Sequence, residues 1–175
     1  MMALSHDFVE PNAMTMRQSM GHFLTGVAII TTEHEGELSG MTISSLTSIS
    51  LEPPILMISL NFNTRTLDGV AGSGRFAASI LGVKQESVAR QFASRGGERF
   101  AEGDFDKTPS GLPAISGALA QLECEVVNDY IIGDHHVFFG KVVHSRDRKG
   151  DELVFNAGKF GSFNDFNHDA VPWIF

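Results

Sequence analysis

Small hydroxyl side chains are concentrated in one uncharged stretch, residues 40–51. Six of the nine residues from Thr42 to Ser50 are Ser or Thr. Their hydroxyls can donate hydrogen bonds to phosphate oxygens, or to the carbonyls and ring nitrogens of a heterocycle, without adding formal charge. The same composition is also typical of a polar edge strand, because Thr suits a pleated strand and Ser often bonds nearby backbone groups. The stretch alone leaves both interpretations open.

A second group of polar side chains follows the next apolar segment. Asn63 or Thr64 can cap a short helix that extends to about Gly72. Three polar residues lie near the start of this helix: Asn61, Arg65 and Thr66. Because the free N–H groups and the dipole of a helix start both favour negative charge, this segment predicts an anion site.

Other chemistries lack the residues that they need. Gly69, Gly72 and Gly74 do not form a G-x-G-x-x-G motif, and there is no Walker-type lysine, so Rossmann and P-loop sites are excluded. The nucleophile elbow G-x-S-x-G is absent as well. His135 and His136 are adjacent, and adjacent side chains on a strand point to opposite faces, so only one of them can face a common site. No metal-binding spacing is present, and no metal is expected.

Strands are the main elements expected to position these residues. The predicted strands are residues 27–32, 38 into the hydroxyl stretch, 55–60, 75–81, 118–127, 136–145 and 153–155. In 118–127, Cys124 belongs to the apolar face, whereas Gln121 and Glu123 belong to the polar face, which predicts a half-buried strand. Because the connections are short and the strands mostly sequential, we expect an antiparallel β-barrel with peripheral helices.

Three helices and one long loop complete the expected arrangement. The first helix would be capped by Asn12 or Thr15 and would end at Gly26, the second would follow Asn63 or Thr64, and the third would span residues 84–94. Residues 96–117 are rich in Gly, Pro and charged side chains, which predicts a long loop.

Length and composition restrict the class of protein further. A single domain, residues 1–175, is expected, with a loose N-terminus at 1–11 and a tail at 162–175. The formal charge of −8 argues against nucleic acid as a partner. No apolar run is long enough to span a membrane. The single cysteine fits a reducing compartment, so a cytoplasmic location is expected.

The order of several motifs is distinctive. The motifs are FLTGVAIITT at 23–32, GMTISSLTSISLEPP at 40–54, residues 76–81 with Gln85, GLP at 111–113, LEC at 122–124 and GDHHVFFG at 133–140. Together they resemble the short-chain flavin reductase family, the FMN-binding split-barrel reductases of two-component flavin monooxygenases, over about residues 16–161. Ser79 and Phe160 depart from the pattern, because the family often has Asn and Tyr there.

The resemblance implies a mainly β fold, an antiparallel and Greek-key-like split barrel, that binds FMN or FAD. The residues implied to contact the flavin are Met41, Thr42, Ser44, Ser45, Ser48, Asn61, Arg65, Thr66, Phe92 and Ala93. His135, the implied catalytic residue, and Phe160 would lie near the nicotinamide of NADH or NADPH. From their own patterns, Phe92 also fits a core helix position, Arg65 a surface charge and His135 a turn histidine bonded to local backbone.

The implied activity is that of an NAD(P)H:flavin oxidoreductase. Hydride would pass from the nicotinamide to the flavin, and the reduced flavin would leave for a separate flavin-dependent oxygenase. Such a transfer needs no protein nucleophile, because the cofactor carries the chemistry. The resemblance also implies a homodimer, with which 14 phenylalanines are compatible. The alternative is a flavin-binding electron carrier or sensor on the same barrel, without reductase turnover.

Overall fold

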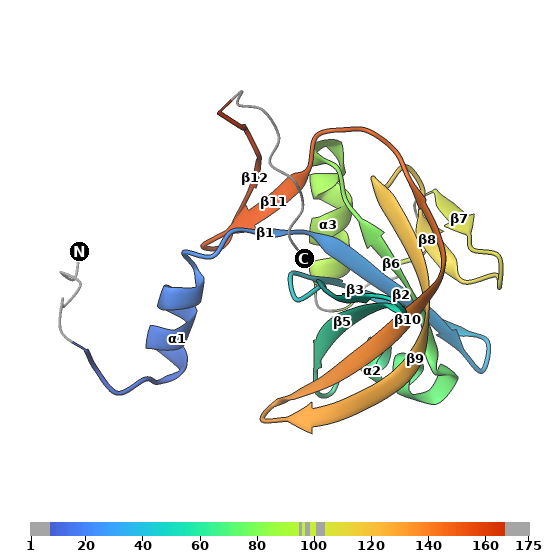
Figure 1. Cartoon of the computed structure of the whole chain (residues 1–175), viewed down its shortest axis with the longest axis horizontal. Helices are drawn as coiled ribbons and strands as arrows, with labels where there is room; N and C mark the ends of the chain where they lie inside the picture. The colour runs from blue at the N-terminus through green and yellow to red at the C-terminus, as the bar shows by residue number, and fades with distance from the viewer. Residues whose placement is uncertain (1–7, 95, 97–98, 101–103, 167–175) are drawn as a thin grey trace.

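Seven antiparallel strands form the central sheet, with β3 and β4 at its two edges (Figure 1). Their spatial order is β3 (Glu37–Ile43), β2 (Ala28–His34), β6 (Arg75–Ile80), β9 (Ala120–Ile132), β10 (His135–Asp147), β5 (Pro54–Asn61) and β4 (Thr47–Leu51). The other elements are α1 (Ala13–Met20), β1 (Thr25–Gly26), α2 (Arg65–Ser73), the 3-10 turn η1 (Val83–Gln85), α3 (Glu86–Ala93), β7 (Phe105–Lys107), β8 (Pro113–Ile115), β11 (Leu153–Asn156) and β12 (Lys159–Ser162). The expected antiparallel, mainly β architecture is confirmed.

This computed structural model describes residues 8–94, 96, 99–100 and 104–166. Several sequence expectations therefore fall partly outside the described residues. They are the loose N-terminus at 1–7, the long loop at 97–98 and 101–103, and the tail at 167–175.

The sheet curls into a barrel around one apolar core. In β2, Ala28 and Ile30 face this core, whereas Ile29 faces a second core under α3, which explains the β-branched run of this strand. The inner core takes residues from strands across the whole sheet, including Ile43 of β3 and Ile58 of β5, so the sheet must close on itself. Cys124 is fully buried there, as expected, and burial raises the pKa of its thiol to about 12.

The barrel is split between β3 and β4, because these two edge strands do not pair with each other. Residues 44–46 connect them, so the hydroxyl stretch forms the end of one edge strand, a bend and the whole of the other. The Ser45 hydroxyl donates to the Ser59 carbonyl at 2.9 Å and accepts from the Ser59 N–H at 3.1 Å. It therefore continues the pairing of β5 beyond the end of β4.

Helix α2 packs closely against β2 and β3 and contributes Leu67 and Val70 to the inner core. Thr64 caps it, as one of the two expected candidates, and accepts a hydrogen bond from the Leu67 N–H at 3.3 Å. A Cβ at Gly69 would lie 2.8 Å from the Ser39 hydroxyl oxygen and 2.8 Å from a methyl carbon of Thr32. Glycine at this position therefore lets the helix backbone approach the barrel.

The segment 96–117 contains more structure than the expected long loop. Its described part forms the hairpin β7–β8 over β9 and buries Gln121 and Glu123, which are 7% and 4% exposed. The Gln121 amide donates to the Asp106 carboxylate at 2.9 Å and to the Ile115 carbonyl at 2.6 Å. The prediction of a half-buried strand was wrong here, because these polar side chains are satisfied by the hairpin rather than by water.

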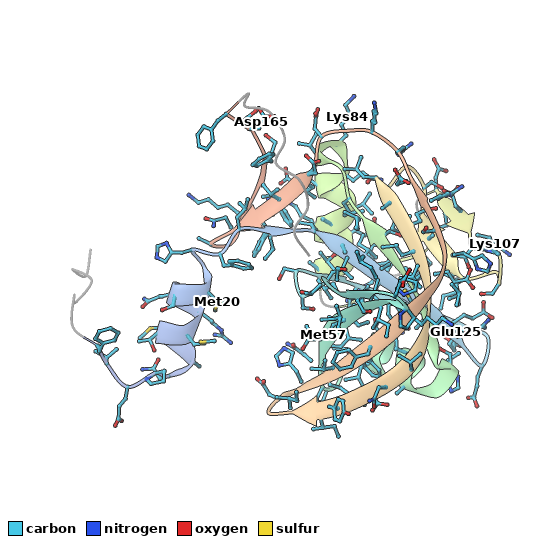
Figure 2. All side chains as sticks on the ribbon, in the orientation of Figure 1. Met20, Met57, Lys84, Lys107, Glu125 and Asp165 are labelled. Atoms are coloured by element: carbon cyan, nitrogen blue, oxygen red, sulfur yellow. The ribbon has the colours of Figure 1, made fainter. Side chains whose placement is uncertain are left out.

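Helix α1 projects from the barrel (Figure 1). Asn12 caps it as expected, but none of its residues is buried. Its side chains, Met20 among them, lie apart from the barrel (Figure 2). The helix ends at Met20 with Gly21 as its C-cap, and Gly26 belongs instead to β1, which joins β11 and β12 in a small sheet. The expected end of this helix at Gly26 was therefore wrong.

Candidate functional site

A groove of about 1350 Å³ lies between β3, the start of α2 and the end of α3. Six of the residues implied to contact flavin line it: Met41, Thr42, Asn61, Arg65, Phe92 and Ala93. The structure thus brings together side chains from positions 41 to 93. The lining residues that were not assigned to the site from the sequence include Ser39, Phe62, Arg99 and Phe100.

Four other implied flavin contacts do not line this groove: Ser44, Ser45, Ser48 and Thr66. The Ser45 hydroxyl is engaged by the backbone of Ser59. Ser44 and Ser48 are exposed beside the split, and Thr66 is buried in the first turn of α2. Their contacts with a ligand remain predictions.

Phe92 forms part of the groove wall from within the core. It is 1% exposed and packs edge-on against Phe100, with ring centroids 5.4 Å apart. Gly40 of β3 makes room for it, because a Cβ there would lie 2.9 Å from a Phe92 ring carbon. The two sequence interpretations of Phe92 are thus combined: it is a core residue that also lines the groove. Phe62, 37% exposed, offers more open apolar surface.

The hydroxyl of Thr42 fixes the spacing between β3 and α3. It donates to the Ala89 carbonyl at 2.7 Å. Ala89 is fully buried in the second core, so this carbonyl has little access to water. The bond therefore holds one wall of the groove against the helix that forms another wall.

Two arginines give the groove its charge. Arg65 follows the Thr64 cap of α2, and Arg99 lies beyond the end of α3. The Arg99 guanidinium donates to the Gly40 carbonyl at 2.6 Å and to the Ser94 carbonyl at 2.5 Å. Burial and the nearby Arg65 lower the pKa of Arg99. Sequence reasoning missed Arg99, because it lies among alternating charges in a loop without a helix or strand pattern.

Two buried hydroxyls near α2 lack hydrogen-bond partners within the described residues. One is Ser39, which is 9% exposed and lines the groove, and the other is Thr66, which is 1% exposed. Buried polar groups are rarely left unpaired in folded proteins. Together with the arginines and the helix start, these donors fit a phosphorylated ligand such as a flavin nucleotide.

His135 lies just past the Phe62 side of the groove. It begins β10 opposite Asn61 of β5, which lines the groove. Its Nδ1 is 2.7 Å from the Asp134 carboxylate, and this hydrogen bond lowers the pKa of Asp134. The neighbouring His136 ring stacks on Phe138 at 4.2 Å between centroids, so the two histidines do diverge.

Phe160 lies elsewhere in the same chain. Its ring packs against Phe155 with centroids 5.4 Å apart, and the Arg90 guanidinium lies 5.0 Å from its centroid. Figure 1 places β12, which contains Phe160, at the opposite side of the molecule from the turn between β9 and β10, where His135 lies. A single chain therefore does not bring these two implied nicotinamide contacts together.

A split barrel with a cationic groove along its open edge strand defines a flavin-nucleotide-binding barrel. The chain belongs to the flavin reductase like family, because the model of the flavin reductase like domain matches residues 20–164. In the described residues, no group of three or more His, Cys, Asp or Glu could hold a metal ion. None of the helices described there is long and apolar enough to cross a membrane.

Three relatives illustrate the family. The chain is 37% identical to the reductase component of a 4-nitrophenol 4-monooxygenase/4-nitrocatechol 2-monooxygenase from Rhodococcus opacus, over 84% of this chain and 79% of that protein. It is 34% identical to the FMN reductase (NADH) SmoA of Agrobacterium fabrum, over 87% of each. The structure of the NADH:FAD oxidoreductase SgcE6 from Streptomyces globisporus C-1027, with NAD and FAD fragments, has a TM-score of 0.86 and 32% identity, covering 93% of this chain and 99% of that chain.

Proposed function

We propose that the groove is the flavin site of an NAD(P)H:flavin oxidoreductase that supplies reduced flavin to a separate flavin-dependent oxygenase. The groove itself carries this proposal, because hydroxyl and N–H donors, apolar side chains and two arginines converge beside the edge strand β3. Relatives support it: one is named as the reductase component of a monooxygenase, and another as an FMN reductase that uses NADH.

The flavin supplies the redox chemistry when it is bound, because its N5 accepts hydride from a dihydronicotinamide. The chain itself binds and orients. Arg65 and the N–H groups at the start of α2 would hold phosphate. Met41 and Phe62 would exclude water from one side of the ring, while the Thr42 hydrogen bond keeps the groove walls apart at a fixed distance.

A second copy of the chain would complete the nicotinamide site. If His135 and Phe160 both contact one nicotinamide, they must come from different chains, because β12 and the β9–β10 turn lie on opposite sides of one chain (Figure 1). Exposed apolar residues are available for such pairing: Met14, Met16 and Met20 of α1, and Tyr130, Ile131 and Ile132 of the β9–β10 hairpin. We therefore propose a homodimer, located in the cytoplasm where NADH is supplied.

The direct test mixes the purified protein with NADH and either FMN or FAD, and follows the absorbance of NADH. We expect NADH to be consumed only when flavin is present. Absence of flavin-dependent consumption with both flavins and both NADH and NADPH would refute a reductase. A protein that is yellow as purified, retains its flavin and oxidises NADH only slowly would instead be an electron carrier or sensor.

A further inference from the structure

Two arginines line the same groove, and no described carboxylate pairs with either of them. The Arg65 side chain forms no hydrogen bond or ion pair within the described part of the chain. In the described part of the chain, the Arg99 guanidinium donates only to the neutral carbonyls of Gly40 and Ser94. Glu37 is the one acidic side chain among the described lining residues, and it pairs with neither arginine. Among the described residues, the groove therefore holds two positive charges without a carboxylate partner.

The Arg99 side chain still has donors for a ligand. A guanidinium has five N–H donors in a planar fork, and the two carbonyls use only part of them. The two bonds hold the fork beside β3, so little side-chain entropy remains to be lost when an anion binds. Burial and, to a smaller extent, repulsion from Arg65 lower the pKa of Arg99, and both arginines line the same groove. An anion with more than one charge would relieve that repulsion.

Two further observations indicate an anion beside α2. The helix has nine residues, and its first turn lies at the groove with Arg65 in it. Ser39, nine-tenths buried and lining the groove, has a hydroxyl without a partner in the described residues. A buried hydroxyl of this kind costs stability until it finds an acceptor, and a phosphate oxygen is a suitable one.

We propose that the groove selects a flavin dinucleotide over a mononucleotide, and that Arg99 is the residue that distinguishes them. This inference rests on the proposed function. Arg65 and the start of α2 would bind the phosphate that FMN and FAD share, and Arg99 would bind the second phosphate, which only FAD carries. The groove volume of about 1350 Å³ exceeds the roughly 300–1,000 Å³ of ordinary small-molecule pockets, which leaves room for the adenosine part.

The test is calorimetric titration of the oxidised flavins, which needs no turnover. Riboflavin, FMN and FAD are titrated into the wild type and into Arg99→Gln, Arg65→Gln and Arg75→Gln, the last a control that removes a positive charge outside the groove. We expect the wild type to bind FAD more tightly than FMN. Arg99→Gln should weaken the binding of FAD by about tenfold or more, the size expected for one lost charge-assisted contact. The binding of FMN should be weakened far less.

The other variants separate the two phosphates. Arg65→Gln should weaken the binding of FMN and FAD equally and leave the binding of riboflavin unchanged. Arg75→Gln should change the affinity for none of the three. In competition, ADP should displace FAD from the wild type at lower concentration than AMP does, and this difference should disappear in Arg99→Gln. Added salt should reduce the preference for FAD, because exposed charge contacts are screened.

Two results would overturn the inference: a wild type that binds FMN as tightly as FAD, or an Arg99→Gln variant that loses both flavins equally. Equal loss of affinity for both flavins is the result expected if Arg99 only holds β3 in place and does not contact the ligand. With either result, the proposed reductase function still holds if NADH is consumed in the presence of flavin. Loss of that consumption in the wild type would instead refute the proposed function.

Discussion

The ring of Phe92 packs so closely against Gly40 that a side chain added at position 40 would displace the ring or the strand. A Cβ would lie 2.9 Å from the ring and 2.9 Å from the Ile30 carbonyl oxygen. Helix α3 and edge strand β3 therefore share one contact that sets both the second core and the groove wall. Their separation is fixed by Gly40 and Phe92 on one side and by the Thr42 hydrogen bond to α3 on the other.

Gly40→Ala should destabilise the fold by about 1–3 kcal/mol, as overpacking of a core does. It should also weaken flavin binding, because the displaced ring or strand distorts the groove. Urea unfolding measures the first effect, and flavin titration measures the second. Gly26→Ala is the matched control, since nothing lies within 4 Å of a Cβ there. Unchanged stability and flavin affinity in Gly40→Ala would show that this contact does not shape the groove.

Ser45→Ala should lower the free energy of unfolding by about 1–3 kcal/mol, because it leaves the N–H and carbonyl of Ser59 without their partner. The loss should appear in urea unfolding without flavin. Ser48→Ala, at an exposed hydroxyl of β4, should be nearly neutral. If Ser45→Ala keeps full stability and only loses flavin, the hydroxyl serves the ligand rather than the split of the barrel.

The buried Glu123 makes stability depend on pH in acid. Burial raises the pKa of its carboxyl, but hydrogen bonds from Ser110 and Thr108 and the nearby His144 outweigh that effect and hold the pKa below its ordinary value of 4.5. Because the folded state then binds this proton less readily than the unfolded chain, the stabilisation is complete above pH 4.5 and is lost as pH falls further.

Urea unfolding of the wild type and Glu123→Gln across this range tests the effect. The difference in unfolding free energy should be constant above pH 4.5 and should shrink below it. Glu125→Gln, on the exposed face of the same strand, serves as the matched control. A difference that grows on acidification would mean that the folded protein binds the proton more tightly than the unfolded chain.

His135→Ala and Phe160→Ala should each raise the KM for NADH more than the KM for flavin. If the two residues meet only across a dimer, co-expressing the two variants with different tags should restore part of the activity, because one site of each mixed dimer is then intact. Steady-state kinetics of the purified mixed dimer measures this. A mixed dimer no more active than its parents would place both residues, if they act at all, in sites of a single chain.

Features of the fold that depend on residues close together in the sequence were predicted well. The β-branched run of β2, the Thr64 cap of α2 and the apolar face of β9 all depend on neighbouring residues, and each was found where the sequence indicated. The failures had distant causes. Gln121 and Glu123 are buried by the β7–β8 hairpin, and the residue pattern of β9 itself does not indicate that this hairpin covers it.

Only some of the residues that line the groove were named from the sequence, because the others are positioned by contacts between distant parts of the chain. Thr42, Asn61, Arg65 and Phe92 were named from motifs, and the structure places them on one groove. The Ser45 hydroxyl, by contrast, could be assigned to the Ser59 backbone only once the strand order was known. Arg99 carries no local signal at all, because its position depends on a contact with Gly40, 59 residues away.

The burial of Cys124 protects its thiol from oxidation during catalysis. Reduced flavin that reaches oxygen before its oxygenase yields hydrogen peroxide, and peroxide attacks thiolates. Burial raises the pKa of the Cys124 thiol to about 12, so the thiol stays protonated at neutral pH, and it lies inside the barrel. Among the methionines that the structure describes, the exposed ones are instead Met14, Met16 and Met20 of α1. Oxidation to methionine sulfoxide, which is reversible, would therefore act on this arm, part of the proposed dimer surface, before it reached the core of the barrel.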